Sequence, residues 1–258
     1  MKGCDIIFVE KMKISIVLIT LNEESNISRC LNSVQWADEI VVYDSGSNDN
    51  TVTIAKNRGA KVVEGPWLGF GPTKRKASEF AKNDWILSID ADEEVPEALA
   101  YEIQRLSLNE NIVYSVPRLS YFLNRWIHHG GWYPDYQARL FNKRSTNWNQ
   151  DLIHEKIEAI HQENLVNHLN HYVFKNIEHQ IQTNNRYSGL LANKMFAGGQ
   201  RFSWFHFLTK PLVKFFECYL LKLGFLDGWA GYVIARGAAY SVFLKWSKLK
   251  EKQMETEV

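Results

Sequence analysis

The sequence contains few cysteines and no long, uncharged hydrophobic run. Its three cysteines are far apart and odd in number, so they fit neither a disulfide framework nor a zinc site, and we expect a reducing compartment. Residues 1–12 carry two acidic side chains and lack an extended apolar core. They therefore do not resemble a secretory signal, and we interpret them as a short extension before a fold that begins at residue 13.

An excess of charge of one sign is also missing. The 258 residues include 30 Lys or Arg and 29 Asp or Glu, a balance that gives no support to bulk nucleic-acid binding, so we expect no nucleic-acid partner. Neither a Gly-x-x-x-x-Gly-Lys-Ser/Thr loop nor a Gly-x-Gly-x-x-Gly fingerprint occurs. These absences argue against the phosphate-binding loop of P-loop enzymes and against Rossmann dinucleotide binding.

From residue 13 to about 116, β-branched runs alternate with segments of helical periodicity. Strands are predicted at 14–20, 39–43, 61–63, 85–89 and 112–116, and helices at 22–34, 51–58, 73–82 and 96–108. This order is typical of βαβ units and predicts an α/β fold with a mainly parallel sheet flanked by helices. From 117 to about 176 the sequence is more irregular, with short strands predicted at 139–141 and 173–174 and a helix at 183–198.

Four carboxylates directly follow the apolar strand that ends at Ile89: Asp90, Asp92, Glu93 and Glu94. Crowded carboxylates raise each other's pKa unless a cation neutralises them. A divalent metal with oxygen ligands, completed by a phosphorylated substrate, would explain the cluster. Acidic residues also favour a helix N-terminus, so the same residues could cap the next helix. Both interpretations can hold together, with Glu93 and Glu94 serving as helix-start residues.

Polar residues follow two further predicted strands. Thr20, Asn22 and Glu23 come after the first strand, and Asp44 ends the second and precedes a glycine-containing turn. Because parallel strands place their carboxyl ends at one edge of a sheet, these residues and Asp90 are expected to line one crevice. Asn22 could instead cap its helix.

These motifs resemble those of a known family. The segments 15–23, 44–51 and 90–92 resemble three successive signatures of family-2 glycosyltransferases, and the chain is more closely similar to the lipopolysaccharide core β-1,4-glucosyltransferase subfamily. The closer similarity rests on Gly69–Arg75, Trp85–Glu93, Gly130–Asp135, Arg139–Phe141, His154-Glu155 and Gly224–Gly228. The resemblance implies a GT-A fold, a UDP-sugar donor, a divalent metal (Mn²⁺ or Mg²⁺) and inversion at the anomeric carbon.

The resemblance also implies residue roles at the donor site. Thr20, Asn22 and Glu23 would line the nucleoside pocket, Asp44 would bond the uracil edge, Asp90 would contact the ribose or a metal-bound water, and Asp92 would coordinate the metal. Lys74 and Arg75 would contact uracil or phosphate, unless they lie on a solvated helix face. Arg139 would contact the diphosphate, unless it forms a structural ion pair. His154 would be an additional metal ligand or would orient a carboxylate, unless neighbouring polar groups simply satisfy it.

Direct displacement at a sugar carbon requires a base for the acceptor hydroxyl. Glu155 and Asp135 are the two candidates. The resemblance implies a base in an acidic motif downstream of the metal motif, often Glu-Asp, and Glu155 is preferred because His154-Glu155 stands in that place. The function implied is transfer of glucose to an inner-core heptose. The alternatives are a related transferase with another UDP-sugar or surface glycan, and a nucleotide-sugar-binding protein without turnover.

The carboxyl-terminal region is rich in aromatic residues and basic. Residues 200–250 contain eight Lys or Arg but two Asp or Glu, with no apolar stretch long enough for a clean transmembrane helix. Aromatic residues flanked by lysines suit a helix lying on an anionic bilayer, although a helical subdomain packed on the sheet is the alternative. The predicted division is therefore an extension (1–12), a catalytic domain (13–200, with halves 13–116 and 117–200) and a helical region (201–258). A lipid-linked acceptor at the cytoplasmic face of the inner membrane is expected.

Overall fold

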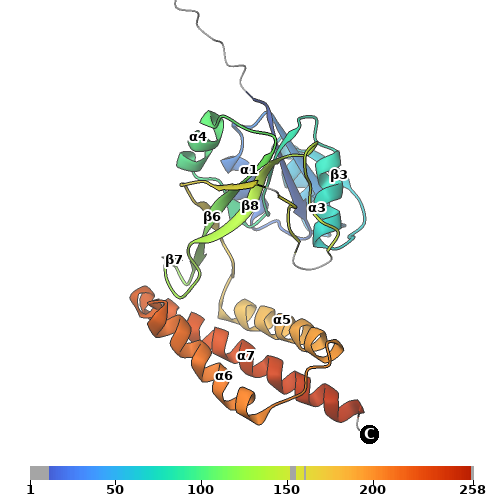
Figure 1. The fold of residues 1–258 in the computed structure, drawn as a ribbon. Helices are drawn as coiled ribbons and strands as arrows, with labels where there is room; N and C mark the ends of the chain where they lie inside the picture. The colour runs from blue at the N-terminus through green and yellow to red at the C-terminus, as the bar shows by residue number, and fades with distance from the viewer. Residues whose placement is uncertain (1–11, 152–154, 160, 257–258) are drawn as a thin grey trace, which may run out of the picture. The chain divides into compact units, whose positions relative to one another are not determined.

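The computed structural model describes residues 12–151, 155–159 and 161–256. The chain forms two compact units. The first, which we call the α/β unit, comprises residues 12–118 and 136–170 and contains the sheet with its flanking helices (Figure 1). The second, the helical unit, comprises residues 119–135 and 171–256. Each unit is described separately below.

The sheet has the strand order β3-β2-β1-β4-β8-β6-β10-β5. Its strands are β1 (Ile14–Thr20), β2 (Glu39–Asp44), β3 (Lys61–Glu64), β4 (Trp85–Ser88), β5 (Glu93–Glu94), β6 (Ile112–Phe122), β8 (Asp135–Asn142) and β10 (Leu169–His171), with β9 (His161–Asn164) paired to β6. The helices of the α/β unit are α1 (Ile27–Ser33), α2 (Thr51–Asn57), α3 (Phe70–Glu79) and α4 (Glu97–Arg105). Strand β1 pairs in parallel with β2 and β4, and β2 pairs in parallel with β3, whereas β8 runs antiparallel to β4.

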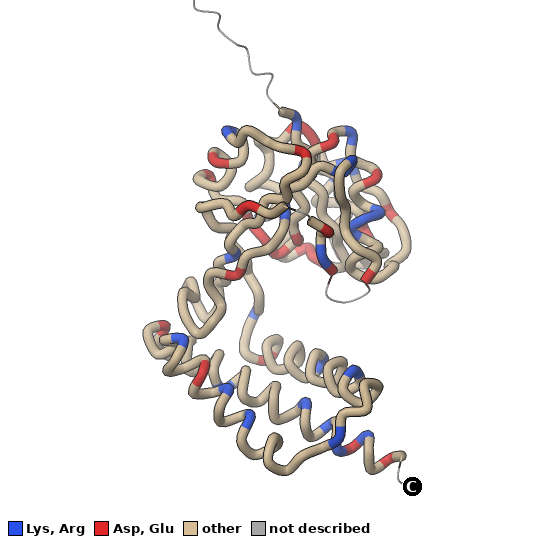
Figure 2. Tube along the Cα trace, in the orientation of Figure 1, with Lys and Arg blue, Asp and Glu red and all other residues tan. Residues whose placement is uncertain are grey.

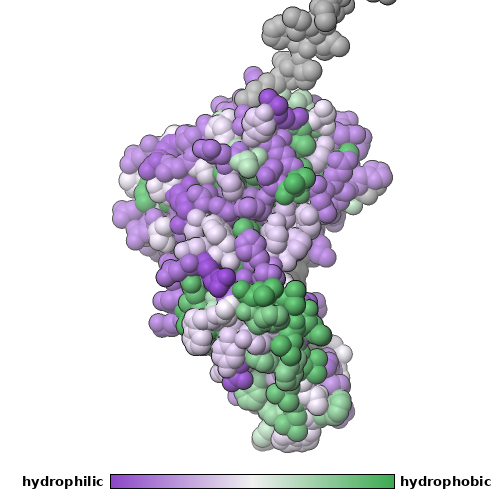
Figure 3. All heavy atoms as spheres, turned by 90° about the vertical axis from the view of Figure 1, so that its left-hand side faces the viewer, coloured by the Kyte–Doolittle hydropathy of each residue, from purple (hydrophilic) through white to green (hydrophobic). Residues whose placement is uncertain are grey.

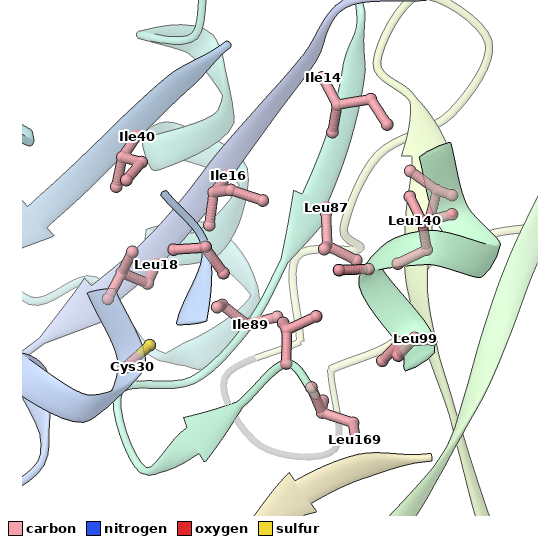
Figure 4. Close-up of a cluster of buried hydrophobic side chains, with 14 of the residues drawn as sticks. Ile14, Ile16, Leu18, Cys30, Ile40, Leu87, Ile89, Leu99, Leu140 and Leu169 are labelled. Carbon is pink, nitrogen blue, oxygen red and sulfur yellow. The ribbon is translucent and has the colours of Figure 1, made fainter. Parts of the chain in front are cut away.

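Strand β1 is buried on both faces, which explains its uninterrupted apolar sequence. Ile14, Ile16 and Leu18 belong to a core cluster that also contains residues of β4, α1 and α4 (Figure 4). Val17 points to the opposite face and packs in a second cluster with residues of β2, β4 and α3. The α/β architecture predicted for residues 13–116 is confirmed, and its central strands hold the loops that follow β1, β2 and β4 at one edge.

The strand predicted at 173–174 is wrong. These residues are outside any strand, and the nearest one is β10, which ends at His171. Phe174 instead packs against Phe122 and Trp132, with ring centroids 5.4 and 6.1 Å apart. Packing of the partly buried aromatic ring against the core of the helical unit replaces the backbone pairing that the apolar sequence suggested.

The helical unit contains β7 (Arg125–Ile127), α5 (Ile177–Ala197), α6 (Trp204–Phe216), the short π-helical turn η1 (Glu217–Leu221), the 3₁₀ turn η2 (Gly224–Asp227) and α7 (Gly228–Thr256). Side chains of Asn176 and Ser203 accept hydrogen bonds from the first turns of α5 and α6, as N-cap residues do. Helices α5 and α6 both pack along α7. The sequence-based boundary at residue 200 would assign α5 to the catalytic domain, whereas in the structure α5 belongs to the helical unit.

Asp227, the last residue of the 3₁₀ turn η2, binds the chain around the short hairpin of β6 and β7. Its buried carboxylate accepts hydrogen bonds from the backbone N–H of His129 at 2.8 Å and of His128 at 3.4 Å. The guanidinium of Arg125 donates to the Asp227 carbonyl at 2.7 Å. The turn η2 packs so closely on α7 that a Cβ at Gly231 of α7 would collide with the carbonyl oxygen of Gly224 in η2.

Within the described ranges, no helix combines the length and the apolar character needed to cross a bilayer. The helical unit nevertheless exposes many large apolar side chains, and Figure 3 shows hydrophobic residues gathered over it. Trp204 and Phe205 at the start of α6 are 67% and 72% exposed. Lysines and arginines predominate over acidic residues along these helices (Figure 2).

Candidate active site

Three parallel strands bring the predicted donor-site residues to one edge of the sheet. Thr20 at the end of β1 lies opposite Asp44 at the end of β2 in the strand register. On the other side of β1, the N–H of Ile89 donates to the Val17 carbonyl at 3.1 Å, so β4 stays beside β1 up to the residue before Asp90. Adjacent strands therefore place Thr20, Asp44 and Asp90, three of the residues predicted to line one crevice, at the same edge of the sheet.

Asp44 is almost fully buried, with 1% of its surface exposed. Its Oδ2 accepts a hydrogen bond from the Thr20 hydroxyl at 2.9 Å, and its Oδ1 accepts from the N–H groups of Gly46 and Ser47 at 3.0 and 2.8 Å. The carboxylate thus fixes the turn after β2 and ties it to β1. Oδ2 also accepts from the Ser47 hydroxyl at 2.5 Å, so the acceptor sites of the carboxylate are occupied within the protein, and its hydrogen bond to uracil stays a prediction.

Asn22 links the loops that follow β1 and β2. Its φ of 58° lies in the left-handed region, which asparagine tolerates better than most residues. Its Oδ1 accepts from the N–H of Asn48 at 2.9 Å, and its own N–H donates to the Ser47 hydroxyl at 2.8 Å. The N–H of Glu23 donates to the Thr51 hydroxyl at 2.8 Å. Asn22 does not cap α1, whose N-cap residue is Asn26.

Lys74 connects two of the predicted site carboxylates. Its Nζ lies 2.9 Å from Oδ1 of Asp90 and 3.1 Å from Oε1 of Glu155. The ammonium group also lies over the ring of Trp148, 4.7 Å from its centroid. The Lys74 side chain is 5% exposed, so it does not lie on a solvated helix face, whereas Arg75 is exposed and donates to the Trp148 carbonyl at 3.0 Å.

The segment that carries Glu155 approaches α3 because of a glycine. The N–H of Gly71 donates to the carbonyl oxygen of Asp151 at 3.2 Å, and a Cβ at Gly71 would meet the backbone oxygens of Asn149 and Asp151 at 2.5 and 2.7 Å. Any larger residue would push this segment away from α3. Gly71 therefore helps to keep Glu155 within reach of Lys74.

On its other side, Asp90 is bound by a buried arginine. The Nη2 atom of Arg139 lies 2.7 Å from Oδ2 of Asp90 and also donates to Oε1 of Glu93. Glu93 is fully buried, and its Oε2 accepts from the N–H of Asp90 at 2.9 Å. Arg118 lies further out, with Nη1 3.7 Å from Oε1 of Glu93. Arg139 thus takes part in a structural ion pair, and its contact with a diphosphate stays a prediction.

The assignment of Glu93 and Glu94 as helix-start residues is wrong. Both lie in the short strand β5, and α4 begins at Glu97 after the N-cap residue Pro96. Glu93 instead forms an ion pair with Arg139, because the buried guanidinium requires a compensating carboxylate. Glu94 accepts a hydrogen bond from the Asn170 amide at 3.1 Å.

The ion pairs with Lys74 and Arg139 keep Asp90 ionised. Burial by itself would raise the pKa of Asp90, but the charges of Arg139 and Lys74 and their hydrogen bonds outweigh it and hold the pKa well below its usual range. Burial likewise opposes the charged form of Arg139, but Asp90 and Glu93 raise its pKa above its ordinary value. Cys30, whose thiol lies 3.6 Å from the Asp90 carbonyl, has its pKa raised by burial and then by Glu93, Asp92 and Asp90. Burial and these negative charges therefore favour the neutral thiol.

The residues present fit a divalent cation shared with a diphosphate. Among the residues that the structure describes, no group of three or more His, Cys, Asp or Glu side chains is arranged to hold a metal by itself. Mg²⁺ characteristically uses one or two carboxylates together with waters and substrate phosphates. Asp92, half-buried in the turn after β4, supplies such a carboxylate, whereas Asp90, two residues earlier, pairs with Lys74 and Arg139 and would reach the cation through a bound water. His154, the third predicted ligand, lies outside the described residues.

The second candidate base lies in a different part of the chain. Asp135 begins β8 and belongs to the helical unit, next to the cis peptide bond between Tyr133 and Pro134. The structure brings Glu155 together with Lys74 and Asp90 within the α/β unit. The choice between the two bases stays a prediction, with Glu155 favoured.

Replacing Glu93 by Gln is expected to lower the free energy of unfolding by about 3 kcal/mol, because Arg139 keeps Asp90 but loses its second, fully buried partner. Urea denaturation followed by circular dichroism would measure this loss as a lower midpoint at unchanged slope. Glu110, exposed between α4 and β6, provides the matched control, and Glu110→Gln is expected to change stability by less than about 0.5 kcal/mol. Equal midpoints for the two variants would contradict the role assigned to Glu93.

Residues 15–162 match the model of glycosyl transferase family 2. An uncharacterized glycosyltransferase of Rickettsia bellii is 34% identical over 94% of this chain and 88% of its own length. The lipopolysaccharide core biosynthesis glycosyltransferase LpsC of Rhizobium meliloti is 26% identical over 95% of this chain and 94% of its own length. Glucosyl-3-phosphoglycerate synthase of Mycobacterium tuberculosis, solved with Mn²⁺, UDP and glucosyl-3-phosphoglycerate, aligns over 43% of this chain and 44% of its own, with 30% identity and a TM-score of 0.36.

Proposed function

Because the chain belongs to glycosyl transferase family 2, as the motifs predicted, we propose that it transfers a hexosyl group from a UDP-sugar to a lipopolysaccharide core acceptor. The chain is thus a glycosyltransferase with a GT-A fold. The observation that carries the proposal is the network of Asp90, Lys74 and Glu155, which joins the strand end of the donor crevice to a second carboxylate. The similarity to LpsC over nearly the whole chain supports a lipopolysaccharide core acceptor.

In this proposal the nucleoside lies at the ends of β1 and β2, against Thr20, Asn22, Glu23 and Asp44. The diphosphate lies near the turn after β4, where Asp92 and Asp90 would hold the cation. A bound Mn²⁺ or Mg²⁺ would supply Lewis-acid stabilisation of the charge on the departing diphosphate. Lys74 places a second positive charge beside Asp90 and Glu155, where an anionic leaving group would be stabilised.

The reaction is a single displacement. An acceptor hydroxyl oxygen forms a bond to the anomeric carbon while the bond from that carbon to the diphosphate oxygen breaks, and UDP leaves with the electron pair. The hydroxyl proton passes to the Glu155 carboxylate, which Lys74 holds in place. Attack from the face opposite the leaving group inverts the configuration of the anomeric carbon.

The acceptor is proposed to be anchored in a membrane. The exposed apolar residues and the basic character of the helical unit support binding at an anionic surface such as the cytoplasmic face of the inner membrane. A peripheral location follows from this proposal, and core lipid and the UDP-sugar are its two substrates. A glucosyl donor and a heptose acceptor are the specific substrates that the subfamily resemblance implies.

The test is UDP release from a panel of UDP-sugars, with and without extracted core lipid and with Mn²⁺ or Mg²⁺. One donor is expected to release UDP rapidly only when core lipid is present, and EDTA is expected to abolish the release until Mn²⁺ is restored. Nuclear magnetic resonance of the product would establish the linkage and a β configuration from an α-linked donor. The absence of UDP release with every donor and metal would refute the enzymatic proposal and favour a binding protein without turnover.

A further inference from the structure

A groove runs between two helices of the helical unit. Helices α5 and α6 each pack along α7 but make few contacts with one another. Between them lies a cavity of about 800 Å³, with residues of α7 as its floor and residues of α5 and α6 as its walls. Ligand pockets in proteins typically measure roughly 300–1,000 Å³. The groove is therefore large enough for a ligand, and it lies apart in sequence from the donor-site motifs.

The lining of the groove is apolar and partly open to solvent. Ile181 of α5, Leu212 of α6 and Trp229 of α7 line it and are 48%, 61% and 67% exposed. Apolar patches of this kind on a soluble surface mark sites where another apolar group binds. The aromatic rings of Tyr232 and Phe243 extend the same lining.

Positive charge accompanies this apolar lining. Arg236 is the one charged residue that lines the groove, and within the described part of the chain it has no ion pair or hydrogen bond to another side chain. Lys210 and Lys214 lie on α6 and Lys245 on α7, and burial together with the charges of the first two lowers the pKa of Lys245. Lys214 already pairs with Glu217 at 3.1 Å, so a bound anion would pair chiefly with Arg236.

We propose that the groove binds an acyl chain of an anionic membrane lipid, with the guanidinium of Arg236 pairing with the lipid phosphate. The inference rests on the membrane-anchored acceptor of the proposed function. An acyl chain fits an open apolar channel, and the guanidinium of Arg236, which has no ion pair among the described residues, matches a phosphate headgroup. A partner helix or a second copy of the chain would leave that charge uncompensated unless it carried acidic residues.

Binding is tested with the full chain and monomeric palmitoyl-lysophosphatidylglycerol below its micelle concentration, measured by isothermal titration calorimetry. Leu212→Asp is expected to weaken binding at least about tenfold, because it places a charge in the apolar channel. Leu208, one helical turn earlier and also 61% exposed, does not line the groove. Leu208→Asp is therefore the matched control and is expected to keep the affinity within about twofold.

Arg236→Gln tests the headgroup. It is expected to weaken binding of lysophosphatidylglycerol about fivefold, the effect of one arginine near an anionic surface. Binding of palmitoyl-lysophosphatidylcholine, which has no net charge, is expected to change less. Lipid carrying a brominated acyl chain should quench a part of the tryptophan fluorescence that Trp229→Phe removes.

Three results would overturn the proposal: no binding of lysophosphatidylglycerol by the wild-type chain, equal losses in Leu208→Asp and Leu212→Asp, or a wild-type dimer that Leu212→Asp dissociates. The last result would make a second copy the occupant. The slow release of UDP to water in the absence of lipid separates this inference from the proposed function, because Leu212→Asp should retain it. If Leu212→Asp loses lipid binding but keeps UDP release, the result bears on the groove alone. If the wild type releases no UDP, the result counts against the enzymatic proposal.

Discussion

Replacing Asp92 by Asn is expected to lower kcat/KM for the UDP-sugar about a thousandfold. A carboxylate that holds a Lewis-acidic cation contributes several kcal/mol to transition-state stabilisation, and each 1.36 kcal/mol corresponds to a factor of ten. Asp92 suits this role because it follows Asp90, whose carboxylate Lys74 and Arg139 fix, and because its own side chain is only half-buried. Steady-state UDP release at several Mn²⁺ concentrations would measure the loss.

Glu94→Gln is the matched control for this experiment. Glu94 lies two residues further along, also half-buried, and its carboxylate accepts a hydrogen bond from Asn170. The control is expected to retain activity within a few fold, and both variants should unfold at nearly the same urea concentration as the wild type. Full activity in Asp92→Asn would remove the metal assignment, while similar losses in both variants would indicate a general effect of charge on the turn.

The sequence predicts most of the α/β unit because its physical signals are local. The apolar run of β1 is buried on both faces, and the turn residues after β2 and β4 stand directly at the strand ends. The helix limits are less accurate: the helix predicted at 22–34 begins at Ile27, because Asn22 bonds to the neighbouring loop instead. A residue whose partner comes from a distant segment cannot be placed from local pattern alone.

Partners from distant segments also explain why the sequence does not predict the contacts of Glu93 and Lys74 at the site. Glu93 resembles a helix-start residue in sequence, and only the folding of β8 beside β4 brings Arg139 to it across 46 positions. Lys74 lies in a run of basic residues that suggests an exposed face, yet the segment around Trp148 covers it. The signal that could have found this network is the excess of carboxylates after Ile89, which requires cations from elsewhere in the chain.

The choice of base stays a prediction, and one contact in the structure bears on it. The sequence favours Glu155 over Asp135 because His154-Glu155 stands where the family has its downstream acidic motif, and the structure links Glu155 to Asp90 through Lys74. An ammonium group between the two carboxylates offsets their repulsion and keeps Glu155 close to the strand edge where the donor is proposed to bind. Gly71 contributes to the same arrangement by admitting the backbone of residues 149–151 against α3.

Glu155→Gln is accordingly expected to lower kcat by a factor of about 10²–10⁴, the range that a general base contributes, with little change in the affinity for UDP. Glutamine keeps the size of the side chain and an oxygen that can accept from Lys74, so a loss of kcat would report proton acceptance and not a displaced segment. Transfer to core lipid measures kcat, and calorimetric titration with UDP measures the affinity.

Asp135→Asn is the competing variant, and the pH dependence of kcat/KM separates the two. If Glu155 is the base, the decline in activity at acidic pH that reports its protonation should disappear in Glu155→Gln and persist in Asp135→Asn. The reverse pattern, with a large loss in Asp135→Asn and a retained acidic limb in Glu155→Gln, would assign the proton to Asp135. Lys74 would then serve to stabilise the diphosphate alone, because the carboxylate it holds beside Asp90 would have no proton to accept.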